Sequence, residues 1–113
     1  MTGSEYQQLA ARTINPALNG IQMLANGVMG LCGEAGEACD MVKKHLHQGH
    51  DLDRDALVKE LGDVEWYVAE LCTVLGVTMD EVLCINIEKL RKRYPDGFDA
   101  ERSIHREESE ARA

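Results

Sequence analysis

Two pairs of acidic residues with the same short spacing could together bind a divalent cation. Glu34 and Glu37 form the first pair, in Glu-Ala-Gly-Glu, and Glu60 and Asp63 form the second, in Glu-Leu-Gly-Asp. Residues three apart on a helix project to neighbouring positions on one side, so each pair offers two carboxylates about one turn apart. If the two helices pack side by side, four carboxylates converge and repel one another. Mg²⁺ and Mn²⁺ prefer carboxylate oxygens, and Mg²⁺ commonly binds through one or two carboxylates plus substrate phosphates.

The same spacing is also common on helix faces that simply meet solvent. Each pair here, however, is flanked by apolar runs and small residues, which favours the metal-binding interpretation. Successive helical residues rotate by about 100°, so Glu60, Asp63 and Tyr67 fall on one side, beside an apolar stripe. Glu34 also borders an apolar stripe, while Glu37 lies further round its helix. Such half-covered acids suit a site that another element or another subunit completes.

Length and composition bound the class of protein. A chain of 113 residues forms one domain at most, and a core this small often gains stability by self-association. The net charge of −8 argues against a protein that coats nucleic acid. No apolar run reaches the roughly 18 residues of a membrane span, and the N-terminus lacks the apolar core of a secretion signal. We therefore expect no nucleic-acid or membrane partner.

Cysteine usage points to a reducing compartment. The sequence contains four cysteines and no C-x-x-C pair, so a zinc or redox motif is not indicated. Each cysteine lies in an apolar stretch, where free Cys behaves as a small hydrophobic residue. We expect reduced cysteines in the core of a cytoplasmic protein.

The apolar periodicity predicts an all-α fold, an antiparallel bundle of about four helices. The small core and the half-covered acids suggest that dimerisation completes the bundle. The first helix is expected over residues 4–14 with Ser4 as its N-cap, and the second over residues 21–48. The third should begin at a cap on Asp53 or Asp55 and end near Gly76, and the fourth should follow Thr78 and end before Pro95. Residues 1–98 would form the domain and residues 99–113 a charged tail, loose unless a partner subunit holds it.

Four glycines recur every third residue inside the second predicted helix, at Gly27, Gly30, Gly33 and Gly36. Each destabilises a helix interior by about 1 kcal/mol relative to Ala. Close approach of another helix would explain them, and so would space for a metal and phosphate beside the acids. The two explanations are compatible.

Several other chemistries are excluded by spacing. Asp51-Leu52-Asp53-Arg54-Asp55 begins like a calcium loop, but its sixth and twelfth positions are Ala56 and Gly62 instead of Gly and Glu. A ferritin-like di-iron site needs Glu-x-x-His on two helices, and no Glu here has His three residues later. The phosphate-binding loop of P-loop NTPases is also missing. The cluster Lys89-Leu90-Arg91-Lys92-Arg93 either complements a helix dipole or clamps phosphate oxygens.

With these elements in place, the sequence resembles the MazG-like all-α nucleoside triphosphate pyrophosphohydrolases, above all their short single-domain bacterial and phage forms. Three segments carry the resemblance: residues 30–37 (Gly-Leu-Cys-Gly-Glu-Ala-Gly-Glu), residues 60–67 (Glu-Leu-Gly-Asp-Val-Glu-Trp-Tyr) and residues 86–98 (Asn-Ile-Glu-Lys-Leu-Arg-Lys-Arg-Tyr-Pro-Asp-Gly-Phe). The combination of E-x-x-E, E-x-x-D and N-x-x-K-x-x-x-R-Y-P is specific. The resemblance extends over residues 6–106.

The resemblance implies a Mg²⁺-dependent enzyme that cleaves a (d)NTP to a (d)NMP and pyrophosphate, in nucleotide-pool house-cleaning. Mn²⁺ would substitute for Mg²⁺. The residues implied as metal-binding and catalytic are Glu34, Glu37, Glu60 and Asp63, with Glu37 the candidate for deprotonating the attacking water. Those implied as substrate-binding are Tyr67, Asn86, Lys89, Arg93 and Trp66. For Trp66, stacking on the base and packing in the core both remain open, with packing favoured. Glu65 occupies a position that is apolar in relatives.

The resemblance also implies an assembly, because such proteins pair helices from two subunits and many form dimers of dimers. A homodimer, doubled to a homotetramer, is therefore expected. The base that the enzyme would select is not encoded in these motifs. The alternative from another functional class is a non-catalytic helical oligomerisation module whose acids form a solvated face.

Overall fold

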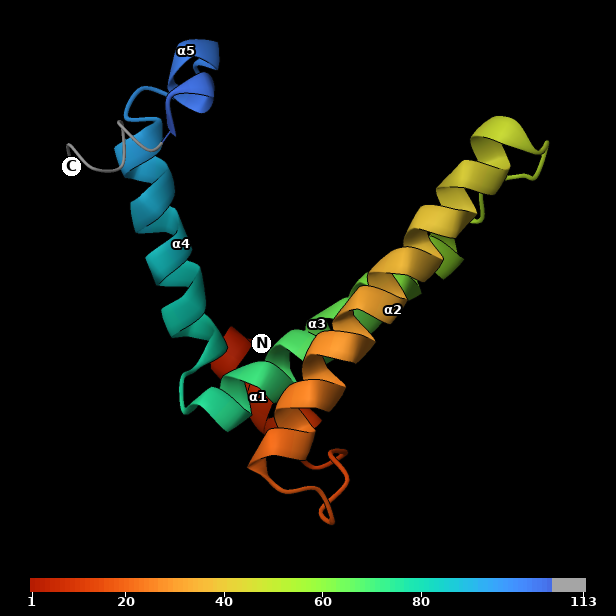
Figure 1. The fold of residues 1–113 in the computed structure, drawn as a ribbon, viewed down its shortest axis with the longest axis vertical. Helices are drawn as coiled ribbons and strands as arrows, with labels where there is room; N and C mark the ends of the chain where they lie inside the picture. Colours follow the sequence, from red (N-terminus) through yellow and green to blue (C-terminus); the bar gives the residue numbers. More distant parts are fainter. Residues whose placement is uncertain (107–113) are drawn as a thin grey trace. The chain divides into compact units, whose positions relative to one another are not determined.

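The computed structural model describes residues 1–106, and its regular structure is entirely helical, which confirms the predicted all-α class. The helices of residues 1–106, in chain order, are α1 (Gly3–Ala11), α2 (Gly20–His47), α3 (Arg54–Leu75), α4 (Met79–Arg93) and α5 (Ala100–Ile104) (Figure 1). The chain divides into two compact units, one ending at Met79 and the other beginning at Asp80, and each is described by itself. Within residues 1–106, no helix combines the length and the hydropathy needed to cross a lipid bilayer.

Helix α1 begins earlier than the sequence analysis expected. Thr2, not Ser4, is the N-cap: its hydroxyl accepts a hydrogen bond from Glu5 N, and the Glu5 carboxylate accepts one from Thr2 N. This reciprocal capping box satisfies two backbone donors that the first helical turn leaves unpaired. The helix ends at Ala11 rather than Ile14, although Thr13 N still bonds to Ala10 O at 2.9 Å.

Helices α2 and α3 form an antiparallel pair along the length of the first unit (Figure 1). Asn19 caps α2 with Gln22 in a second capping box, and Asp53 caps α3 through a bond to Ala56 N. Gly76 ends α3 in the left-handed conformation, with φ of 71°, which an L side chain rarely adopts. The predicted limits of both helices are confirmed within one residue at each end where a limit was specified.

The core of the first unit lies between α1 and α3. Its buried hydrophobic members are Ala10, Ala69, Cys72 and Met79, and the half-buried side chains packed around them are Tyr6, Trp66, Val68 and Val77. Gln7 adds a polar clamp, because its Nε2 donates to Val77 O at 2.9 Å and its Oε1 accepts from Met79 N at 2.8 Å. Helix α1 is thus fixed on α3 by apolar packing and by hydrogen bonds.

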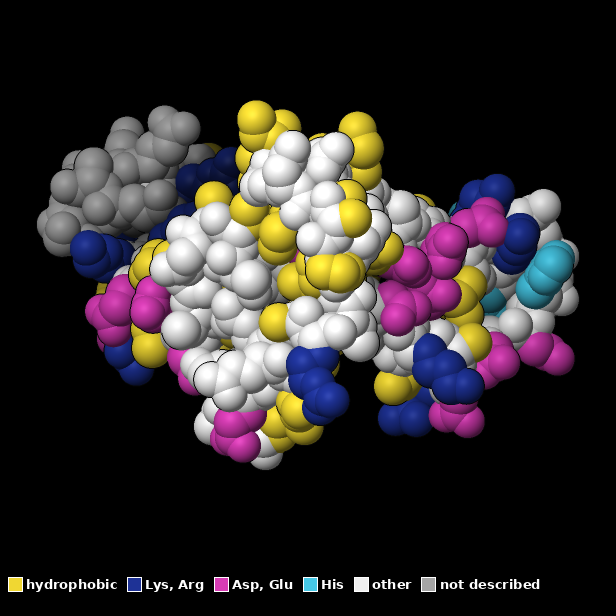
Figure 2. Space-filling view, turned by 90° about the horizontal axis from the view of Figure 1, so that it is seen from below, with side chains coloured by type: hydrophobic (Ala, Val, Ile, Leu, Met, Phe, Trp, Pro, Cys, Tyr) yellow, Lys and Arg dark blue, Asp and Glu magenta, His cyan; other side chains and the backbone are white. Residues whose placement is uncertain are grey.

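Much of the expected apolar stripe is not buried in this chain. On α2 and α3, Leu24, Val28, Leu61 and Leu75 are between 41% and 64% exposed. Figure 2 shows hydrophobic side chains at the surface among charged ones. The cysteine expectation was also wrong in part: Cys72 is buried, but the remaining cysteines, Cys32, Cys39 and Cys84, are exposed. Two packed helices cover only one side of each other, and therefore the outer side of each apolar stripe stays uncovered.

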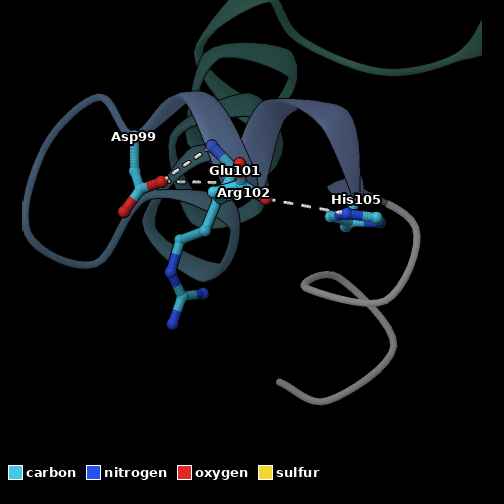
Figure 3. A network of polar contacts seen from close by, with 4 residues as sticks. All are labelled: Asp99, Glu101, Arg102 and His105. Carbon is cyan, nitrogen blue, oxygen red and sulfur yellow. Dashed lines mark hydrogen bonds and ion pairs between the residues drawn. The ribbon is translucent and has the colours of Figure 1, made fainter.

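In the second unit, the segment expected to be a loose tail contains helix α5. Asp99 caps it: one carboxylate oxygen accepts hydrogen bonds from Glu101 N and Arg102 N at 2.9 and 3.2 Å (Figure 3). At the other end, His105 N bonds to Glu101 O at 2.9 Å. Before α5, the rings of Tyr94 and Phe98 pack with centroids 5.6 Å apart. The rest of the expected tail, residues 107–113, lies outside the described residues.

Candidate metal and nucleotide site

The structure brings three of the four predicted acids together. Carboxylate oxygens of Glu34 and Glu37 on α2 and of Glu60 on α3 all lie within 4.8 Å of one another. The antiparallel pairing of α2 with α3 produces this convergence, because it brings Glu34 and Glu37 on one helix beside Glu60 on the other. Glu34 and Glu60 are half-buried and Glu37 is exposed, so the cluster opens to solvent on one side.

Asp63, the fourth predicted acid, is exposed and lies beside the three-acid cluster without joining it. It lines a pocket of about 390 Å³ whose other lining residues are Thr13, Glu34, Trp66 and Tyr67. Glu34 belongs to both the cluster and the pocket. A cation held by the cluster would therefore sit at the edge of this open pocket.

The Glu34 carboxyl has an environment that opposes its negative charge. Its pKa is raised, first by a side-chain hydrogen bond with Glu60, which requires a proton, then by burial, and also by the charges of Glu60 and Asp63. Hydrogen bonding with Glu37 acts in the opposite direction. The like charges around Glu34 are what a bound cation would neutralise.

The acids fit a hard divalent cation. When the carboxylates are ionised, Glu34 Oε2 and Glu60 Oε2 are buried oxygens with no hydrogen-bond donor among residues 1–106. A buried oxygen without a partner is destabilising unless another group satisfies it. Oxygen ligands from three carboxylates match Mg²⁺ or Mn²⁺ and lack the nitrogen or sulfur that would select zinc.

Tyr67 reaches the pocket because α2 carries a glycine opposite it. A Cβ built on Gly30 would overlap the Tyr67 ring, so only glycine admits this ring between the helices. Gly27 likewise makes room for Leu71, whereas a Cβ on Gly33 or Gly36 would meet nothing within 4 Å. Two of the four regularly spaced glycines are thus explained by contact with α3.

Trp66 both packs on the core and lines the pocket. Its ring is perpendicular to that of Tyr67, at an interplanar angle of 85° and a centroid distance of 5.0 Å. Its Nε1–H donates to Thr13 Oγ1 at 2.7 Å. The pocket lining therefore combines two acids with two aromatic rings.

The remaining predicted substrate residues lie on α4, in the second unit. Asn86 and Lys89 are exposed, and Arg93 is half-buried with its guanidinium 5.7 Å from the centre of the Tyr94 ring. At helical spacing Asn86, Lys89 and Arg93 share one side of α4. Side chains on one side of a helix can contact the same ligand.

Further along α2, Asp40 forms ion pairs with two lysines of its own helix. Lys44 Nζ lies 2.8 Å and Lys43 Nζ 3.5 Å from the Asp40 carboxylate. The hydrogen bond with Lys44 is the main cause of the lowered pKa of Asp40. These pairs are partly exposed and contribute little to stability.

Sequence reasoning missed Thr13 and Glu70. Nothing in the sequence marks Thr13, because its contact with Trp66 joins residues 53 positions apart. Glu70 is only 1% exposed, and its Oε1 accepts a hydrogen bond from Asn26 Nδ2 at 2.8 Å. The sequence did carry a signal that Glu70 is buried, because this acid lies inside the apolar run from Val68 to Cys72.

The sequence of this chain is similar to a known protein family. The family model of the MazG nucleotide pyrophosphohydrolase domain matches residues 22–98. The Gene 37 protein of Mycobacterium phage L5 is 43% identical to this chain over 81 residues, which cover 68% of this chain and 71% of the phage protein. No solved structure matches the chain significantly.

Proposed function

The chain belongs to the MazG nucleotide pyrophosphohydrolase domain family, and we propose that it hydrolyses nucleoside triphosphates to nucleoside monophosphates and pyrophosphate with Mg²⁺. The observation that carries this proposal is the convergence of Glu34, Glu37 and Glu60 beside a pocket with aromatic walls. The proposed role is removal of unwanted (d)NTPs from the nucleotide pool.

Glu34, Glu60 and Asp63 would hold the metal together with Glu37. When bound, the cation would neutralise the triphosphate and lower the pKa of a water molecule positioned for attack. Glu37 is the exposed member of the cluster, which suits it to accept a proton from that water. Mn²⁺, with the same preference for oxygen ligands, would substitute for Mg²⁺.

Tyr67, Trp66, Asn86, Lys89 and Arg93 form the proposed substrate-binding set. The Tyr67 and Trp66 rings would contact the nucleoside, because aromatic side chains offer flat apolar faces to sugar and base. Asn86 would donate hydrogen bonds, and Lys89 and Arg93 would neutralise phosphate oxygens. Each role follows from the chemistry of the side chain.

We further propose a homodimer, doubled to a homotetramer. The support is the set of large apolar side chains that α2 and α3 leave exposed, because covering apolar surface is favourable. Leu24 and Val28 on α2 and Leu61 on α3 are half-exposed at 41%, 48% and 56%. Contact with a second copy would remove them from water.

The test is a panel of NTPs and dNTPs incubated with the full chain and Mg²⁺. Pyrophosphate and inorganic phosphate are measured separately, because release of pyrophosphate with a monophosphate identifies cleavage between the α- and β-phosphates. Phosphate release alone would point to a different bond. If neither product forms from any nucleotide while the chain is folded, the proposed activity is wrong and a non-catalytic oligomerisation module becomes the better interpretation.

A further inference from the structure

The segment that precedes the family match contributes directly to the pocket. The match begins at residue 22, yet Thr13, two residues beyond the end of α1, lines the pocket with Glu34, Asp63, Trp66 and Tyr67. Helix α1 therefore does more than cover the core. It places a polar side chain at a cavity whose other walls come from the matched domain.

The Thr13 hydroxyl has one proton, and the structure accounts for it. Thr13 Oγ1 donates to Ala10 O at 2.7 Å, which leaves its lone pairs free to accept. The indole N–H of Trp66 is a donor only and points at this oxygen from 2.7 Å. The two bonds form a chain in which the backbone of α1 orients the hydroxyl, and the hydroxyl orients the indole.

This chain of bonds starts from a rigid element. Ala10 is buried against the core, and Gln7 ties α1 to Val77 O and Met79 N. Trp66 Nε1 is thus fixed relative to α3 by a group that itself cannot move freely. The perpendicular contact between Trp66 and Tyr67 then fixes a second ring at the pocket.

We propose that Thr13 is a positioning residue for nucleotide recognition: its hydroxyl holds the Trp66 indole as a pocket wall that contacts the nucleobase. This inference rests on the proposed function, because it identifies the part of the substrate that this wall meets. Glu34 and Asp63 are the charged members of the pocket lining and would bind phosphate through metal, so the two aromatic rings are the part of the lining suited to the flat faces of the base. Aromatic side chains can stack on any of the bases, because every base has a flat π-face.

The chain contains a single tryptophan, so its fluorescence reports Trp66 alone. Calorimetry and Trp66 emission would be recorded on the full chain with Mg²⁺. The ligands are α,β-imido dUTP and α,β-imido dATP, which cannot be cleaved at that bond, and inorganic tripolyphosphate, which has no base. Binding is thereby measured without turnover.

Three variants separate positioning from general stability. Thr13→Val keeps the shape of the side chain and removes the acceptor, whereas Thr13→Ser keeps the acceptor. Thr73→Val is the matched control, because Thr73 Oγ1 accepts from Gln7 Nε2 at 3.3 Å and donates to Ala69 O at 3.0 Å without lining the pocket. It removes one hydrogen bond between α1 and α3, and it leaves the Trp66 bond and the Gln7 bonds to Val77 O and Met79 N intact.

We expect the analogues, but not tripolyphosphate, to change Trp66 emission in the wild-type chain. Thr13→Val should shift the emission of the free protein and raise the Kd of at least one imido nucleotide about fivefold, the effect of losing one hydrogen bond. Its Kd for tripolyphosphate should stay unchanged. Thr13→Ser and Thr73→Val should bind every ligand as the wild type does.

Any of the following results would overturn the inference: no effect of either analogue on Trp66 emission, equal nucleotide Kd values for Thr13→Val and Thr13→Ser, or equal weakening by Thr13→Val and Thr73→Val. A loss of tripolyphosphate affinity in Thr13→Val as large as the loss of nucleotide affinity would also overturn it. These readouts need no hydrolysis. Failure of the proposed activity would appear separately, as nucleotide binding without pyrophosphate release.

Discussion

Gly30 of α2 lies directly against the ring of Tyr67 of α3, and a side chain on Gly30 would occupy the space of that ring. The contact explains a glycine inside a long helix, where it weakens the helix by about 1 kcal/mol relative to Ala. It also links helix packing to the candidate site, since Tyr67 lines the pocket beside Glu34.

Gly30→Ala should therefore displace Tyr67 and destabilise the fold by about 1–3 kcal/mol, the usual range for overpacking. Gly33→Ala is the matched control three residues away, because a Cβ there meets nothing within 4 Å in the chain. It should be neutral or stabilise the helix by up to about 1 kcal/mol. Urea unfolding of both variants measures the difference. Equal stabilities would show that Tyr67 moves aside at no cost.

Removal of metal should abolish hydrolysis. The two buried oxygens, Glu34 Oε2 and Glu60 Oε2, lack donors among the described residues, and no histidine or cysteine joins the acid cluster there. Excess EDTA should stop pyrophosphate release, and added Mg²⁺ or Mn²⁺ should restore it. Full turnover in excess EDTA would show that the acids do not act through a metal.

Glu37→Gln should lower kcat by about 10²-fold, as loss of one electrostatic contact to a transition state typically does. The variant should stay folded, because removing one of several like charges relieves repulsion. Asp55→Asn is the control, because the side chain of this acid is 90% exposed. It should keep the wild-type rate. Near-normal turnover of Glu37→Gln would remove Glu37 from the catalytic set.

The sequence predicted those parts of the structure that depend on local signals. The sequence identified the Asp53 cap, the end of α3 at Gly76 and the three-residue spacing of the acids. Each of these features depends only on residues within one helical turn, so it could be predicted without knowledge of the fold. The capping box at Thr2 was equally local, with Glu5 three residues on, and was overlooked in favour of Ser4. The signal for the Thr2 cap was therefore present in the sequence.

Other features depend on which helices meet, and the sequence did not reveal them. The Thr13–Trp66 bond joins α1 to α3, and the Gly30–Tyr67 contact joins α2 to α3. The exposure of Cys32 and Cys39 likewise depends on how much of α2 a neighbour covers. Apolar periodicity predicts a face that can be buried but not the element that buries it.

The pair formed by Asn26 and Glu70 gives a prediction about stability that is independent of catalysis. Glu70 is buried, its Oε1 accepts from Asn26 Nδ2 at 2.8 Å, and its Oε2 has no partner among residues 1–106. Asn26→Ala should destabilise the fold by about 1–3 kcal/mol, because the buried acid loses its donor. In a Glu70→Met background the same substitution should have little effect. A double-mutant cycle measures this, and equal effects in both backgrounds would mean that the two side chains do not interact.

Assembly is the last prediction, and it follows from the side chains that this chain leaves uncovered. Leu24, Val28 and Leu61 are half-exposed on α2 and α3, and covering such residues contributes about 25 cal/mol per Å². We expect a dimer or tetramer that persists at high salt, because apolar burial is not screened by ions. Val28→Asp should dissociate it, whereas Ile104→Asp on α5 should not. Light scattering at micromolar concentration measures the mass. A mass near the 12.6 kDa of one chain for the wild type would refute the assembly and leave the site to be completed within a single subunit.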